Sequence, residues 1–295
     1  MSSLNPSELK SLISLLDDND PEVFSHIEEK IVTLGKQVIP VLEDVWSKSF
    51  DALLQQRVEN IIHKIQFQTL KENLKTWRDE NENDLLAGII LIARYQYPDL
   101  DEKKIHHFLD KIAGEAMYEV KSFLPPAEKI NALNKILFNV YGFNGNTANF
   151  HSPQNSFINT VLETRKGNPL MLSVVYSLLA KQLGINCSGV NLPEHFILAY
   201  IEKSSTQAIE YTNPEAGIVF YINAFSRGSV FGKKDIDKFL QKLNLKPEKH
   251  FYEPCRNREI IFRSLRNLAL SYQKLGDMEK ENELQELLEY ISSEK

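Results

Sequence analysis

The stretch that decides the fold lies in the middle of the chain, where a helix opening precedes a set of strands. Its first part reads Arg165-Lys166-Gly167-Asn168-Pro169-Leu170-Met171-Leu172. We expect this helix to close at Leu183-Gly184-Ile185, and the chain then leads to Pro193-Glu194-His195-Phe196. Proline suits the first turn of a helix, because its missing N–H would have no partner there. The sequence therefore predicts a helix from Pro169, followed by strands that carry His195.

The residues after this helix change from a helical to a strand-like pattern. β-Branched and aromatic residues gather at 190–200, 208–211 and 218–222, and a hairpin-type loop, Asn213–Gly217, precedes the last group. Helical spacing of apolar residues marks most of the remaining chain, before and after this region. The sequence thus predicts an α+β fold that is mainly helical, with a small antiparallel sheet.

The chain divides into three expected regions. Residues 1–78 carry short helical stripes with a "D-x-x-P-E-V" turn near Pro21 and a "G-x-x-x-I-P-x-L" step from Gly35, which are typical of HEAT-like repeats. A polar stretch, Arg78–Asp84, is predicted to be a linker or an exposed turn. Residues 85–250 form the core, and residues 251–295 form a helical hairpin similar to one tetratricopeptide unit. Because so few repeat units cannot form a repeat domain alone, we expect both flanking regions to dock on a neighbour.

Composition excludes several classes of function. The net charge is −6 and no basic cluster occurs, so neither nucleic acid nor an anionic membrane is an expected partner. The longest apolar run, Leu85–Ala93, is about nine residues and half of what a bilayer needs. The first residues lack the pattern of a secretory signal, so we expect a cytoplasmic protein. Two cysteines exclude a disulfide scaffold and the usual thiolate zinc site, and no cofactor is expected.

The order of the central motifs resembles the papain- or transglutaminase-like fold of the cysteine-protease class, and this resemblance implies a core of that kind around the small sheet. In that fold "G-x-C" opens a helix, "L-G-I" closes it, a strand ends near a histidine, and the next strand ends in aspartate or asparagine. The helix N-terminus lowers the pKa of the thiol, and the imidazole takes its proton. Within this superfamily the chain is most similar to the bacterial SirB-type proteins, which pair such a core with a tetratricopeptide-like tail. The motifs that carry this narrower resemblance are Ala93–Leu100, Leu133-Asn134, Gly142–Asn146, Asn155-Ser156, Arg165–Pro169 and Pro193–Phe196.

The resemblance implies a site that lacks its nucleophile. The cysteine position of the superfamily falls about fifteen residues before Gly184, at Pro169, where the SirB-type branch also carries proline. His195 matches the family histidine, and we expect the third member of the triad at Asn213. Two of the three degenerate triad positions therefore keep a polar side chain, without the group that would attack a substrate. Whether the protein is an enzyme stays open at this point, although we expect that it is not.

The two cysteines and one adjacent pair of histidines are further candidates for a reactive or metal-binding site. Cys187 starts a strand and Cys255 precedes a helix, and both are expected to be structural. His106 and His107 are adjacent on a helix and point about 100° apart, so no metal site is predicted.

Three polar residues near the helix opening are candidates for ligand binding. Arg165 would either pair with an acidic residue to fix its loop or recognise an anionic ligand. Asn155 and His195 could line the same cleft. Ser173, one helical turn after Pro169, is more typical of a small packing residue than of a replacement nucleophile.

Three functions are compatible with these features. The first is a pseudoenzyme-like module that binds a peptide or small ligand in the degenerate cleft, with a protein partner suggested by the flanking helices and a regulatory role by the SirB resemblance. The second is a hydrolase or transferase acting on an amide, with His195 as general base and no cysteine nucleophile. The third is a purely structural helical scaffold.

Overall fold

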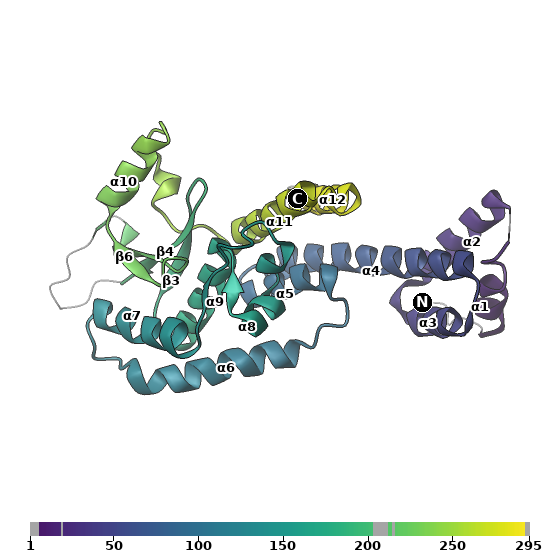
Figure 1. Cartoon of the computed structure of the whole chain (residues 1–295), viewed down its shortest axis with the longest axis horizontal. Coiled ribbons are helices and arrows are strands. Elements are labelled where there is room, and N and C mark those ends of the chain that lie inside the picture. Colours follow the sequence, from purple (N-terminus) through teal and green to yellow (C-terminus); the bar gives the residue numbers. More distant parts are fainter. Residues whose placement is uncertain (1–5, 19, 203–211, 214–215, 293–295) are drawn as a thin grey trace. The chain divides into compact units, whose positions relative to one another are not determined.

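The computed structural model describes residues 6–18, 20–202, 212–213 and 216–292 (Figure 1). Contacts divide the chain into two compact units, Met1–Thr76 and Trp77–Lys295. Helices predominate and one four-stranded antiparallel sheet is present, which confirms the α+β class. Among the described residues, no helix is long and apolar enough to cross a membrane.

The first unit consists of short helices around one apolar core. Its elements are α1 (Pro6–Ile13), α2 (Pro21–Leu34), the 3₁₀ turn η1 (Gly35–Val38), α3 (Ile39–Lys48) and the start of α4 (Ala52–Glu80). The Asp20 carboxylate caps α2 by accepting the N–H of Glu22, and Gly35 ends the helix with a positive φ of 72°. The core contains Ile13, Leu16, Ile27, Ile31, Val38, Leu42, Val58, Ile61 and Ile65. The HEAT-like assignment of these helices stays a prediction.

The first three residues of the stretch 78–84, which was expected to be a linker or an exposed turn, are helical. Helix α4 continues through Glu80, and only the four residues after it form a turn before α5 (Leu85–Gln96). The Trp77 indole donates to the Asp84 carbonyl at 2.7 Å, and the Arg78 guanidinium donates to the Tyr290 carbonyl at 2.7 Å. The prediction was therefore wrong for residues 78–80, whereas residues 81–84 form the exposed turn that it allowed.

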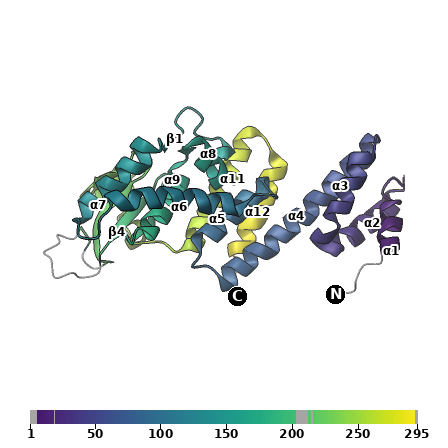
Figure 2. The same ribbon diagram turned by 90° about the horizontal axis from the view of Figure 1, so that it is seen from below.

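The second unit places helices on both sides of the sheet (Figures 1 and 2). Before the sheet come α6 (Glu102–Glu119), α7 (Pro126–Asn134), the π-helical turn η2 (Lys135–Val140), η3 (Pro153–Ser156), α8 (Ile158–Thr164) and α9 (Pro169–Gln182). Two short strands, β1 (Asn144–Gly145) and β2 (Lys166–Gly167), pair in parallel. After the sheet come α10 (Lys233–Lys242), η5 (Lys249–Phe251), α11 (Asn257–Leu275) and α12 (Met278–Ser292).

The sheet has the order β3 (Cys187–Asn191), β4 (Phe196–Ile201), β5 (Ile218–Asn223), β6 (Ser229–Phe231). Side chains alternate between its two faces. Ile197, Ala199 and Tyr221 share a buried cluster with Ile236 and Leu240 of α10. The intervening residues of β4 point to the opposite face, where α9 packs on β3 and β4. The sheet therefore separates α9 from α10.

Helices α11 and α12 form an antiparallel hairpin that packs on α5 (Figure 2). Gly276, in the left-handed conformation, ends α11 before the turn. The Tyr272 hydroxyl donates to Gln96 at 2.8 Å, and the Tyr95 hydroxyl donates to the Glu283 carboxylate at 2.7 Å. The hairpin thus docks on the core as the sequence led us to expect, while its likeness to a tetratricopeptide unit stays a prediction.

Candidate functional site

The first turn of α9 is the element on which the candidate site is built. The Asn168 side-chain oxygen caps the helix by accepting the Met171 N–H at 2.8 Å, and Pro169 occupies the first helical position. The Ser173 hydroxyl donates to the Pro169 carbonyl at 2.8 Å and lies 3.3 Å from the Phe196 carbonyl. The backbone of Phe196, which follows His195, therefore lies against the N-terminal half of α9, whereas the His195 ring itself packs on Phe239 of α10.

A network of asparagines holds the loop before α8 to this helix end. The Asn146 amide donates to the Asn155 side-chain oxygen at 2.8 Å, and the Asn155 amide donates to the carbonyls of Asn149 and Phe150 at 2.7 and 3.1 Å. The Asn168 amide donates to the Ser156 hydroxyl at 2.9 Å. Asn155 is only 2% exposed. Because both of its N–H donors are used inside the loop, Asn155 holds the backbone and is not placed for the ligand contact predicted from the sequence.

His195 is exposed and lies in the turn between β3 and β4. Glu194 before it adopts a left-handed conformation with φ of 59°, and the His195 ring lies 4.9 Å from the Phe239 ring of α10, measured between centroids. Within the described part of the chain, no side chain hydrogen-bonds to this imidazole. The ring is therefore held by packing and has no polar partner to orient it.

The structure does not bring Asn213 to His195. Asn213 forms a bridge with Ile218, and β5 pairs Ile218 with Ile201 at the far end of β4. Six residues of strand separate the two ends of β4, which is about 20 Å. The Tyr221 hydroxyl of β5 donates to the Tyr252 carbonyl at 2.9 Å and not to His195. The prediction of Asn213 as the third triad position was therefore wrong, because the register of the sheet places Asn213 at the other end of β4.

Asn223 is the polar residue that the sheet does place near His195. It ends β5 one position beyond the Leu198–Ile222 pair, toward the His195 end of β4. Its side-chain oxygen accepts the Ser226 N–H at 3.1 Å and so shapes the following turn. The sequence contained a signal for Asn223, because this residue directly follows the β-branched and aromatic run 218–222. In the superfamily pattern, the strand after the histidine ends in aspartate or asparagine.

Arg165 lies on another side of the same segment. It ends α8 in the left-handed conformation with φ of 63°, and its guanidinium carbon lies 4.2 Å from the centroid of the Phe108 ring and 5.3 Å from that of Phe143. Burial lowers the pKa of Arg165 below its ordinary value, and the neighbouring Tyr141 opposes this shift. Arg165 thus faces α6, whereas His195 contacts α10, and the two do not share one cleft.

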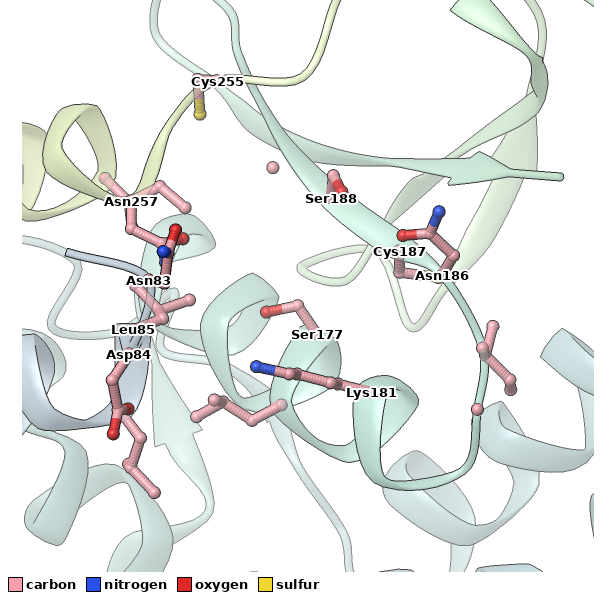
Figure 3. A pocket seen from close by; sticks show the side chains of 16 residues that line it. Asn83, Asp84, Leu85, Ser177, Lys181, Asn186, Cys187, Ser188, Cys255 and Asn257 are labelled. Atoms are coloured by element: carbon pink, nitrogen blue, oxygen red, sulfur yellow. The ribbon is translucent and has the colours of Figure 1, made fainter. Parts of the chain in front are cut away.

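Both cysteines lie away from Pro169. They line a cavity of about 380 Å³ together with Ser177 and Lys181, which are eight and twelve residues after Pro169 on α9 (Figure 3). At 1.5 Å per residue these α9 positions lie about 12–18 Å along the axis from the helix opening. The Cys255 sulfur points toward this cavity (Figure 3). Burial raises the pKa of the Cys187 thiol well above its ordinary value and that of Cys255 to about 12.

No metal site stands out near these groups. In the described part of the chain, no three histidine, cysteine, aspartate or glutamate side chains are grouped so that they could hold an ion. His106 and His107 are both exposed on α6.

Comparison with known proteins gives the family. The model of the transglutaminase-like superfamily matches residues 103–266, more than half of the chain, and this segment contains Pro169, His195 and Asn223. The chain belongs to the transglutaminase-like superfamily. A UPF0162 protein of Xylella fastidiosa (strain Temecula1) is 31% identical over 204 residues, which cover 69% of each chain.

More distant relatives share the same region. A UPF0162 protein of Escherichia coli K12 is 25% identical over 203 residues, which cover 68% of this chain and 70% of that protein. The human F-box only protein 21 is 24% identical over 204 residues, which cover 61% of this chain but only 32% of that protein. No match was found among solved structures.

Proposed function

We propose that this member of the transglutaminase-like superfamily binds a peptide or small ligand and does no covalent chemistry on it. One observation carries the proposal. The helix opening at which the superfamily pattern places a thiol holds Pro169, and both thiols of the chain line a cavity beside the second half of the helix. The partner is thus expected to be held and released unchanged.

The Ser173 hydroxyl of this helix is not available as a substitute. Ser173 is 0% exposed, and its hydroxyl donates to the Pro169 carbonyl. A nucleophilic serine needs an adjacent general base that accepts its proton, and this one donates to a backbone oxygen instead. This arrangement supports binding over acyl transfer.

The alternative of an amide hydrolase with His195 as general base has less support. Such a base needs a partner that orients its ring and holds its tautomer. The described residues provide packing against Phe239 but no hydrogen bond to the imidazole. Asn223, which ends β5 on the side of His195, uses its side-chain oxygen in its own turn.

We further place the chain in the SirB-type branch, with a tetratricopeptide-like tail and a regulatory role through a protein partner. The six motifs that resemble this branch support the placement, and so does the hairpin that packs on α5. The N-terminal unit, which the family model does not cover, would supply a HEAT-like surface for that partner.

The test compares the unmodified protein with a Pro169→Cys variant. The variant thiol would stand at the first position of α9, where free N–H groups and the helix dipole lower a thiol pKa. We expect it to react with iodoacetamide at pH 7 at least tenfold faster than an ordinary thiol, while the unmodified protein hydrolyses neither p-nitrophenyl esters nor p-nitroanilides. The proposal fails if the unmodified protein turns these substrates over and a His195→Ala variant does not.

A further inference from the structure

A groove lined by α6, α8 and the connection between α5 and α6 contains polar atoms for which the described residues provide no partner. It measures about 810 Å³ and its walls include Tyr97, Leu100, Ile105, Phe108 and Leu162. Part of this wall comes from the Ala93–Leu100 motif, which the degenerate triad does not use. The groove is therefore separate from the contact between α9 and β4.

The guanidinium of Arg165 forms one end of this groove. Its planar group lies over the Phe108 ring, yet it makes no hydrogen bond or ion pair within the described residues, and its Nη1 is buried without a partner. The carboxylates of Asp99, Asp101 and Glu163 also line the groove, but none pairs with it. A buried N–H group in a protein normally has a hydrogen-bond partner. An unpaired arginine fork held flat on an aromatic ring is suited to a carboxylate supplied by a ligand.

Asn159 supplies the complementary polar group. Its side-chain oxygen is buried and accepts no hydrogen bond in the described structure, and it lines the same groove. Asn159 is the second residue of α8 and Arg165 follows the last, so they are about 9 Å apart along the helix axis. Three residues of an extended peptide span about 10 Å. An N–H donor three residues before a carboxylate would therefore match the spacing.

We propose that this groove binds the carboxyl-terminal end of an extended peptide. The terminal carboxylate pairs with Arg165, and the N–H of the third residue from the end donates to the Asn159 side-chain oxygen. Apolar side chains of the peptide lie against Leu100, Ile105 and Phe108. This inference rests on the proposed function, since it names the ligand that the protein would bind without changing it.

The charges of the groove favour a single carboxylate over a polyanion. Lys104 is the one other cation among the groove residues, against three carboxylates. The chain carries a net charge of −6. This excess of negative charge would repel a nucleic acid or a phosphorylated surface, whereas a single carboxylate can pair with the one arginine of the groove.

The test titrates the protein, labelled with ¹⁵N-arginine, with a pool of randomised N-acetyl tripeptides that end in a free carboxylate. The Nε–H signal of Arg165, identified by its absence in Arg165→Lys, reports contact with the carboxylate. We expect this signal to shift on titration, and the same pool with amidated ends to bind at least tenfold more weakly. That factor corresponds to the loss of one charge-assisted hydrogen bond. This comparison uses the unmodified protein and does not depend on how a variant folds.

Variants separate the specific contact from general attraction. We expect Arg165→Lys, which keeps the charge but loses the fork, to weaken binding about tenfold, and Asn159→Ala to weaken it several-fold. Lys104→Gln, which removes a charge from the same groove, is the matched control and should change affinity less than twofold. Equal binding of the free and amidated pools, or an equal loss in Lys104→Gln and Arg165→Lys, would overturn the groove assignment. Hydrolysis of the tripeptides would instead overturn the proposed function.

Discussion

The two native thiols should react far more slowly in the folded protein than in the unfolded chain. Both cysteines are half-buried, and burial raises the pKa of Cys255 to about 12. At pH 7.5 an ordinary thiol of pKa about 8.5 is roughly one-tenth thiolate, whereas a thiol of pKa about 12 is roughly 3 × 10⁻⁵ thiolate. Because the thiolate is the reactive form, the folded state loses roughly 3,000-fold in reactive species.

The greater basicity of such a thiolate offsets part of this loss. Thiolate nucleophilicity rises with pKa with a Brønsted coefficient of about 0.45, which over 3.5 pKa units is roughly 40-fold. The net expectation for Cys255 is a reaction rate roughly 100-fold below that of an ordinary thiol, before any shielding by the cavity wall. Cys187, whose thiol pKa is raised well above its ordinary value by burial, should react more slowly still.

The assay is the rate of reaction with an aromatic disulfide at pH 7.5, measured in native buffer and in denaturant. Cys187→Ala and Cys255→Ala assign the two rates to their thiols. Pro169→Cys adds a thiol at the helix opening that should react in native buffer, and it controls for access of the reagent. If either native thiol reacts within tenfold of its unfolded rate, the argument that burial removes both cysteines from chemistry is wrong.

Two further predictions concern stability. Burial raises the pKa of Tyr221 and of Tyr272 to about 12 each. The unfolded chain releases these protons near pH 10, so the free energy of unfolding keeps its full value below that pH. It falls as the pH rises toward 12, by up to about 2–3 kcal/mol per residue. Urea denaturation from pH 8 to 11 measures this fall, and a free energy of unfolding that stays constant above pH 10 would contradict it. Gly228 has a φ of 74°, and an added Cβ would lie 1.9 Å from the Asn134 side-chain oxygen. Gly228→Ala should therefore lower the free energy of unfolding by at least about 3 kcal/mol, because it adds a clash to backbone strain. The control Gly184→Ala, with a φ of 70° and open space around its Cβ, should lower it by only about 1 kcal/mol. Equal losses for the two variants in denaturant melts would show that the contact with Asn134 does not matter.

Local signals in the sequence predicted the element on which the site is built. Asn168 as a helix cap and Pro169 at the first helical position are determined by neighbouring backbone groups, and the structure has both. The α+β class was equally predictable, because the change from helical to strand-like spacing after Ile185 needs no tertiary information.

Features that depend on distant partners could not be read in the same way. Asn213 and Asn223 both stand beside strand-like residues, and only the register of β4 against β5 shows which of them approaches His195. The groove at Arg165 exists because α8 packs near α6, which brings Phe108 under the guanidinium from 57 residues earlier in the chain. The helical conformation of Arg78 could not be predicted from its polar neighbours, because its partner, the Tyr290 carbonyl, lies in α12 at the other end of the chain.

The central claim is that the core holds a ligand without breaking or forming a bond in it. Incubation of the protein with the free-carboxyl tripeptide pool in H₂¹⁸O, followed by mass spectrometry, tests it most directly, because even reversible amide hydrolysis would leave ¹⁸O in the peptide. The account predicts ¹⁸O incorporation no greater than in a protein-free control, under conditions in which the Arg165 signal shows that the pool is bound. Incorporation above that control that is abolished in His195→Ala would contradict it.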